Sequence, residues 1–245
     1  MVMSPQFALG QAVHEVVEGL SLLPTKERFN KKLVPEFERV WEKFSGKNGG
    51  FFDIETEFKV KERGIAMVRR VETNPGPLAN LAVKLNMDLP YYFLSEPDNI
   101  ILCGKIDWME YLPETDSLHI IDFKTGKVGE RDDSFQLPIY VLLARNLQKR
   151  AVEKVSYWYL EYEDSVKEKE IPDIDLVEKE ILNVGKRMKA ARSLGRFDCP
   201  KGGCRYCEEM ERVVAGEAEY VGVGGFGKDV YVLRPRETEV TSTII

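Results

Sequence analysis

The sequence predicts an α/β fold, with a mixed central β-sheet flanked by helices, on the basis of three observations. Short apolar runs rich in β-branched and aromatic residues indicate strands at 89–94, 100–108, 118–123 and 156–162. A stretch with helical spacing, 134–148, separates the last two runs, and a helix between two strands permits a parallel crossover. Helical stretches on either side of these runs can then cover both faces of the sheet.

The first third of the chain is predicted to be helical. Apolar residues recur there at helical spacing in two stripes, which are Val13, Val16, Val17 and Leu20, and then Val34, Phe37, Val40, Trp41 and Phe44. The glycine-rich residues 46–50 end the second stripe. Residues 51–68 fit either a strand or a helix. We favour the helix, because charged residues are interleaved there at a spacing that supports one.

Breaker and turn residues divide the rest of the chain. Asn74–Pro77 ends the helical pattern before the first strand, and Pro113–Asp116 has the composition of a hairpin loop between the second and third strands. An amphipathic helix ends near Gly195, with its apolar stripe at Val177, Ile181, Val184 and Met188. Residues after Ala218 include a glycine-rich stretch and a polar tail, which we expect to be partly mobile.

Two acids and one lysine stand where neighbouring strands end. If Leu112 and Ser117 are partners across the hairpin loop, the register places Asp107 opposite Asp122. Facing side chains in an antiparallel pair lie about 5 Å apart, and like charges at that distance repel. Lys124 follows Asp122 by two residues, so it lies on the same face of the strand. A cation would make this carboxylate pair tolerable, and the pattern therefore indicates a metal-dependent hydrolytic site.

The motifs resemble those of the PD-(D/E)XK nuclease superfamily, and more closely those of its RecB-like branch. The resemblance spans roughly residues 10 to 210. Its landmarks, in order, are Gly10–His14, Gly104–Asp107, Asp122–Gly126, Gln136–Tyr140 and a group of three cysteines. A lone Asp-x-Lys occurs by chance in many proteins, whereas this ordered set is much harder to obtain by accident. The resemblance implies a restriction-endonuclease-like core with a mixed sheet.

The resemblance also implies a set of metal ligands. Asp107, Asp122 and the backbone carbonyl of Phe123 would hold Mg²⁺ or Mn²⁺, which prefer hard oxygen ligands. His14 would contact the metal or the attacking nucleophile. Many relatives carry a further acid on the strand that precedes the Gly-x-x-Asp motif. In this sequence Asp88 is the nearest candidate for that acid.

Three further positions complete the predicted site. Lys124 would position the attacking water and neutralise developing charge, and we expect burial and a nearby cation to lower its pKa. Gln136 and Tyr140 lie four residues apart on one helix face, where in relatives they contact the nucleic acid or brace the lysine. Trp108, Tyr140 and Trp158 are either stacking platforms for unpaired bases or core residues. His119 falls on the opposite strand face from Asp122, and we interpret it as structural.

The cysteines leave two interpretations open. Cys199, Cys204 and Cys207 lie close enough in sequence to ligate zinc or, as in some RecB-like nucleases, an iron–sulfur cluster. Their spacing differs from that of the usual trio, and no cysteine precedes Cys103, so a packing role is the alternative. Cys103 lies in a predicted strand and is expected to be a small core residue.

Composition limits the class of protein. With 43% hydrophobic and 31% charged residues, the 245-residue chain can bury one sizeable core, and no apolar run approaches the ~20 residues that span a bilayer. Met1–Ala8 lack the features of a signal peptide, so we expect a cytoplasmic protein without a membrane partner. The net charge of -6 does not favour nonspecific coating of nucleic acid.

The sequence therefore predicts a divalent-metal-dependent deoxyribonuclease. By resemblance it is an exonuclease acting on single strands or ends in DNA repair, recombination or defence, with a helicase or other repair proteins as partners. The nuclease domain is predicted at 1–215, with its central sheet and catalytic core at 88–162 and the cysteine segment at 196–210, followed by a tail at 216–245. The alternatives are a catalytically inactive nucleic-acid or partner-binding module with the same fold, and a small metal-cluster protein.

Overall fold

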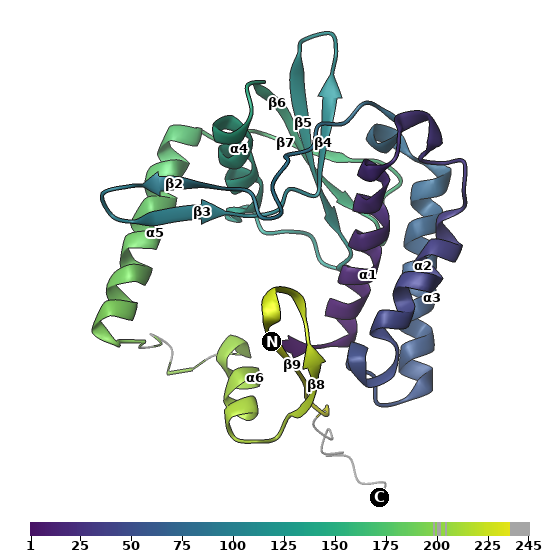
Figure 1. Ribbon diagram of the computed structural model, residues 1–245, viewed down its shortest axis with the longest axis vertical. Helices are drawn as coiled ribbons and strands as arrows, with labels where there is room; N and C mark the ends of the chain where they lie inside the picture. The colour runs from purple at the N-terminus through teal and green to yellow at the C-terminus, as the bar shows by residue number, and fades with distance from the viewer. Residues whose placement is uncertain (198, 200–201, 204, 236–245) are drawn as a thin grey trace, which may run out of the picture.

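A computed structural model describes residues 1–197, 199, 202–203 and 205–235 (Figure 1). Its helices are α1 (Pro5–Gly19), α2 (Leu33–Trp41), α3 (Ile54–Thr73), α4 (Gln136–Leu147), α5 (Ile174–Leu194) and α6 (Arg205–Val214). Its strands are β1 (Val2–Met3), β2 (Tyr91–Ser95), β3 (Ile100–Cys103), β4 (Trp108–Leu112), β5 (Ser117–Lys124), β6 (Val152–Tyr159), β7 (Lys167–Lys169), β8 (Glu219–Val223) and β9 (Asp229–Val232). A short 3₁₀ helix, η1 (Leu20–Leu22), follows α1.

The central sheet has four strands in the order β4-β5-β6-β7. Strands β4 and β5 form the predicted hairpin, with Leu112 paired to Ser117 as the loop composition indicated. Strands β5 and β6 run parallel and are connected by α4, so the predicted crossover is confirmed. The remaining pair, β6 and β7, is antiparallel, which makes the sheet mixed. The expected α/β fold with a mixed sheet is thus present.

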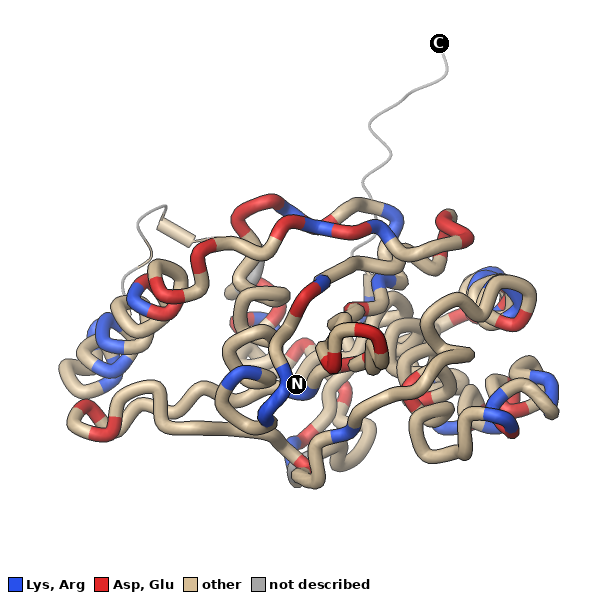
Figure 2. Tube along the Cα trace, turned by 90° about the horizontal axis from the view of Figure 1, so that it is seen from above, with Lys and Arg blue, Asp and Glu red and all other residues tan. Residues whose placement is uncertain are grey.

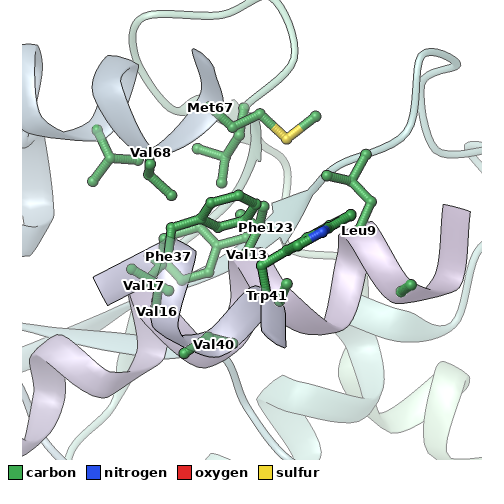
Figure 3. Close-up of a cluster of buried hydrophobic side chains, with 14 of the residues drawn as sticks. Leu9, Val13, Val16, Val17, Phe37, Val40, Trp41, Met67, Val68 and Phe123 are labelled. Atoms are coloured by element: carbon green, nitrogen blue, oxygen red, sulfur yellow. The ribbon is translucent and has the colours of Figure 1, made fainter. Parts of the chain in front are cut away.

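Helices cover both faces of this sheet, because side chains of β5 alternate between two cores. Leu118 and Ile120 pack under α4 in one core, together with apolar residues of that helix. Ile121 and Phe123 point the other way, into a larger core shared with α1, α2 and α3. Figure 3 shows Phe123 among side chains of these three helices. The site at the end of β5 is therefore anchored from both sides of the sheet.

The helical layer forms largely as the apolar stripes predicted. Residues 51–68 fall mainly in α3, which confirms the preference for helix over strand there. Asp53 begins α3 by accepting a hydrogen bond from the Thr56 amide, as an N-cap acid should. Helix α3 packs closely on α2, because Gly64 leaves no side chain between α3 and the ring of Phe37.

The apolar run 100–108 is not one strand, contrary to the sequence prediction. Strand β3 ends at Cys103, and regular pairing resumes only with β4 at Trp108. The Gly104 amide donates a hydrogen bond to the Pro90 carbonyl (3.0 Å), and α4 lies so close that an added Cβ at Gly104 would come within 3.2 Å of Leu143. The chain bends there, so β2 and β3 form a two-stranded sheet separate from the hairpin of β4 and β5.

The end of the described chain holds a small sheet that the sequence did not predict. Strands β8 and β9 form a hairpin that pairs with β1. The rest of the predicted tail, 236–245, lies outside the described residues. Figure 1 places this hairpin beside the N-terminus, at the start of α1. The N-terminal ammonium group donates to the Asp229 carbonyl at 2.7 Å. Because β1 and β9 are far apart in sequence, short-range patterns do not reveal this pairing.

Candidate active site

Helix α1 carries the first of the predicted site residues. His14 and Glu18 stand one turn apart, so both side chains emerge from the same helix face. Gly10 lets α1 approach the end of β5, since an added Cβ there would lie 3.3 Å from Thr125 Oγ1. His14 Nε2 lies 3.0 Å from the Phe123 carbonyl oxygen, and its Nδ1 lies 3.0 Å from Glu18 Oε1. Both partners are acceptors, so both ring nitrogens donate, as in a protonated imidazole.

The charge around His14 favours that protonated form. Burial alone would lower the pKa of His14, but the hydrogen bond to Glu18 and the nearby charge of Asp107 raise it above its ordinary value. His14 Nδ1 lies 3.6 Å from Asp107 Oδ2. The structure thus brings together His14 and the two predicted metal ligands nearest to it, Asp107 and the Phe123 carbonyl.

Asp107 and Asp122 converge, although Asp107 lies just outside β4. Asp107 Oδ2 accepts a hydrogen bond from the Phe123 amide at 2.9 Å, which holds its carboxylate beside the strand that bears Asp122. Asp122 is fully buried. Burial, reinforced by the charge of Asp122, raises the pKa of Asp107 to about 7 despite the opposing pull of His14. Burial also raises the pKa of Asp122, against the effect of Lys124.

Lys124 is held by several groups at once. Its Nζ lies 2.9 Å from Asp122 Oδ2 and 3.0 Å from Glu130 Oε2, and it donates to Gln136 Oε1 at 2.5 Å. It also lies 5.1 Å from the centre of the Tyr157 ring. The pKa of Lys124 is raised: burial alone would lower it, but the two carboxylates outweigh burial. A lowered pKa in the presence of a bound cation stays a prediction, while without the ion Asp122 raises this pKa, joined by Glu130, which the sequence did not place beside the lysine.

Gln136 links the lysine to the acid. Its Nε2 donates to Asp122 Oδ1 at 2.6 Å and to the Tyr140 hydroxyl at 3.2 Å, while its Oε1 accepts from Lys124. This geometry agrees with the bracing role, and contact of Gln136 and Tyr140 with nucleic acid stays a prediction. Tyr140 is only 8% exposed, and burial followed by the charges of Asp107 and Asp122 raises the pKa of its hydroxyl.

Glu18 is a site residue that the sequence motifs did not single out. Ligand atoms of His14, Glu18 and Asp107 all lie within 4.8 Å of one another. Burial would raise the pKa of Glu18, but hydrogen bonds from His14 and Lys105 lower it below its ordinary value. The available signal was helical spacing, because an acid four residues after His14 must share its face. Asp88, the candidate suggested by the strand pattern, is exposed.

A cavity of about 260 Å³ opens beside this cluster. Glu18, Lys105 and Asp107 form its polar side, and Asp88 lies in its lining. The apolar lining comes from η1 and the segment before β2, and it includes Leu22, Val83, Leu85 and Met87. Glu18 and Asp107 are therefore accessible from a partly apolar cavity.

The donor set suits a hard divalent cation. Carboxylate oxygens and a backbone carbonyl converge beside one imidazole, and Mg²⁺ and Mn²⁺ favour the oxygen ligands of this set. Burial raises the pKa of both Asp107 and Asp122, because water no longer stabilises their charged forms. A divalent ion would stabilise those charged forms, so the residues fit the group.

The family model of the PD-(D/E)XK nuclease superfamily matches residues 3–212. The chain belongs to the PD-(D/E)XK nuclease superfamily. Proteins of this superfamily are generally nucleases that use divalent metals, and the superfamily implies DNA as substrate. No curated protein matches the chain significantly. The match includes every residue that the sequence motifs singled out, from His14 to Cys207, and the RecB-like branch stays a prediction.

Several other predicted residues lie outside the cluster of acids, His14 and Lys124. Trp108, 2% exposed, and Trp158, fully buried, are core residues rather than stacking platforms. His119 is buried between Glu110 (2.8 Å) and Ser156 (2.7 Å), in agreement with its structural interpretation. Cys103 is exposed at the end of β3, so its expected core position was wrong.

The cysteine segment leaves the cluster prediction open. Cys199 is partly exposed, and Cys207 is exposed on α6. Cys204 lies outside the described residues. Within the described part of the chain, none of the helices is both long and apolar enough to span a bilayer.

Proposed function

We propose that this chain is a divalent-metal-dependent deoxyribonuclease that hydrolyses DNA phosphodiester bonds by attack of water. One observation carries the proposal: Asp107, Asp122, Lys124 and His14 converge at the end of β5, next to an open cavity. In this proposal Asp107, Asp122 and the Phe123 carbonyl hold Mg²⁺ or Mn²⁺, and His14 joins them through a ring nitrogen that gives up its proton when the ion binds. When bound, the ion lowers the pKa of a ligated water and offsets charge on the phosphate.

Lys124 acts as a fixed cation in this proposal. Its raised pKa keeps the amine protonated near neutral pH, so it orients water and balances developing negative charge rather than abstracting a proton. Asp122, Glu130 and Gln136 hold Nζ in place before substrate arrives, which reduces the reorganisation that the reaction requires. Gln136 is thus a positioning residue, and Tyr140 supports it from one helical turn away.

Glu18 joins the proposed ligand set as the third carboxylate. It lies on the same helix face as His14 and within reach of Asp107, while Lys105 partly neutralises it at 2.5 Å. This arrangement supplies from helix α1 an acid that many relatives carry on a strand. The negative charge available to a cation increases accordingly.

The RecB-like order of the motifs supports exonuclease action on single strands or ends. It also supports a role in DNA repair, recombination or defence, with a helicase or other repair proteins as partners. We retain zinc or an iron–sulfur cluster at Cys199, Cys204 and Cys207 as a separate proposal. The visible spectrum of anaerobically purified protein tests it, since a four-iron cluster absorbs visible light and zinc does not.

A nuclease assay with single- and double-stranded DNA and either Mg²⁺ or Mn²⁺ tests the proposed function. We expect Asp122→Ala and Lys124→Ala to abolish cleavage without unfolding the chain, as judged by circular dichroism. The matched control is Lys127→Ala, which removes an exposed lysine three residues away and should leave cleavage intact.

Cleavage at the wild-type rate by either site variant would refute the assignment. A wild-type chain that binds Mn²⁺ and DNA but cuts neither substrate would instead support the inactive binding module. Exonuclease and endonuclease action are separated by comparing a linear strand with a closed circular one, because an exonuclease needs an end.

A further inference from the structure

The two-stranded sheet β2–β3 presents an apolar face to solvent. Tyr91 pairs with Cys103 and Phe93 with Ile101, so all four side chains lie on one side of the ribbon. Tyr91 is 45% exposed, Phe93 49% and Ile101 50%. Figure 2 shows the two strands as a long run without charged residues, with acids only at the tip. We name this face, Tyr91, Phe93, Ile101 and Cys103, the aromatic ladder.

The opposite face of the same ribbon is already covered. Leu102 is buried, and Tyr92 and Leu94 pack with it against residues of α4 and α5, including Leu142 and Ile181. Helix α5 approaches this side closely, since an added Cβ at Gly185 would lie 3.2 Å from Ile100. The ribbon is therefore held rigidly from behind, while its aromatic ladder stays open.

The aromatic ladder is continuous with the candidate active site. Pro90, the residue before Tyr91, lines the cavity beside Asp107, as do Met87 and Lys105. On the partner strand, only Gly104–Ile106 separate Cys103 from Asp107. A ligand that lies along the ladder and continues past Tyr91 thus enters the cavity next to the acids. Lys84, exposed in the cavity lining, offers positive charge to a phosphate there, whereas Lys105 is already paired with Glu18.

The spacing of the ladder suits an unpaired strand. Tyr91 and Phe93 stand two residues apart on one strand, about 7 Å at the usual strand rise. This is roughly twice the 3.4 Å step of stacked bases in B-DNA, so the two rings fit bases that are separated from each other. Aromatic rings accept any base by stacking, whereas a duplex keeps its base faces covered. The chemistry thus favours a single strand over a duplex.

We infer that an unpaired DNA strand lies along β2–β3, stacks bases on Tyr91 and Phe93, and passes into the cavity beside Asp107. This inference rests on the proposed nuclease function and specifies its substrate as single-stranded DNA. The strand reaches the metal ligands through the bend at Gly104–Ile106. Because β3 ends at Cys103 and β4 begins only at Trp108, the segment between them connects the aromatic ladder to the candidate active site.

A binding experiment tests the inference directly. In the full chain with Asp122→Ala to prevent cleavage, we measure binding of a fluorescein-labelled 15-nucleotide oligo(dT) by anisotropy in Mg²⁺. Tyr91→Ala and Phe93→Ala should each weaken binding by at least about fivefold, given the usual worth of one base–aromatic stack. Phe58→Ala, which removes an even more exposed ring on α3 (62%), is the matched control and should not change the binding of oligo(dT).

A fluorescence readout reports the contact itself. Trp41, Trp108 and Trp158 are all buried, so a Phe93→Trp variant adds one exposed indole. Its emission should be quenched by oligo(dT) and not by a duplex of the same length. Equal quenching by both, or none by oligo(dT), would overturn the inference.

Kinetics separate failure of the inference from failure of the proposed function. In the otherwise wild-type chain, Tyr91→Ala/Phe93→Ala should raise KM for oligo(dT) but leave hydrolysis of bis(p-nitrophenyl) phosphate, which is too small to reach the ladder, unchanged. If the double variant is active with a normal KM for oligo(dT), only the inference about the aromatic ladder is rejected. If the wild-type chain cleaves neither substrate, the proposed nuclease function is rejected as well. A shift from dimer to monomer by light scattering, with KM unchanged, would instead assign the ladder to contact between copies of this chain.

Discussion

Single residues decide how much negative charge the candidate site presents, and Glu18 adds to it from helix α1. We predict that Glu18→Gln weakens Mn²⁺ binding by about tenfold or more, because it removes a charged oxygen that shares the cluster with His14 and Asp107. Isothermal titration calorimetry measures the change. Glu15→Gln is the matched control, since Glu15 lies on the same helix but pairs with Lys43. An equal loss of Mn²⁺ affinity in both variants would show that Glu18 acts only through the overall charge and not as a ligand.

Glu130 acts on the site through Lys124. We predict that Glu130→Gln lowers the pKa of Lys124, because one of the two carboxylates that raise it disappears. The amine then loses its proton at a lower pH, and cleavage should decline earlier on the alkaline side of its pH profile. Asp132→Asn, in the same loop and 97% exposed, should leave the profile in place. An unchanged alkaline limb in Glu130→Gln would show that Lys124 is not the group that titrates there.

Whole elements must be held in register for these residues to meet, and the contact of α3 with α2 is part of that support. An added Cβ at Gly64 would come within 2.2 Å of the Phe37 ring, which is fully buried. We predict that Gly64→Ala destabilises the fold by about 1–3 kcal/mol, the usual cost of overpacking. Gly19→Ala is the comparison, because an added Cβ there meets nothing within 4 Å. Urea unfolding of both variants measures the difference, and equal stability would contradict the packing argument.

Patterns within one element or one hairpin were readable from the sequence. The helical stripes, the parallel crossover and the Leu112–Ser117 register depend on residues near one another in the chain. That register brought Asp107 to Asp122, because one known pair in a hairpin fixes the rest.

Long-range contacts were not readable in this way. The bend at Gly104 depends on the Pro90 carbonyl and on α4, while the local sequence continues as an apolar run. Pairing of β9 with β1 joins the two ends of the described chain. Glu130 reaches Lys124 from a polar loop without periodicity, so only the folded chain shows that the lysine has two acid partners.

The stability of the whole molecule should depend on the protonation of its acid cluster. An acid whose folded pKa is raised binds its proton more tightly in the folded chain than in the unfolded one. Folding is then favoured at low pH and loses that contribution as pH rises from the unfolded pKa towards the folded one. Asp107 is such an acid, because its pKa is raised from 3.8 to about 7, and the pKa of Asp122 is shifted in the same direction. The pKa of His14 is also raised, so its contribution to stability is lost as pH rises through the pKa of the folded state.

All three shifts have the same sign, so we predict that the chain without divalent metal melts at a higher temperature at pH 6 than at pH 8. Calorimetry in EDTA measures this difference. Mg²⁺ or Mn²⁺ should raise Tm more at pH 8, because ionised carboxylates bind the ion and the ion stabilises the state that binds it. Asp107→Asn removes the acid whose pKa rises to about 7, so the Tm of this variant should vary less between the two pH values. A wild-type Tm that rises from pH 6 to pH 8 in EDTA would show that the buried acids are not the groups that carry this pH dependence.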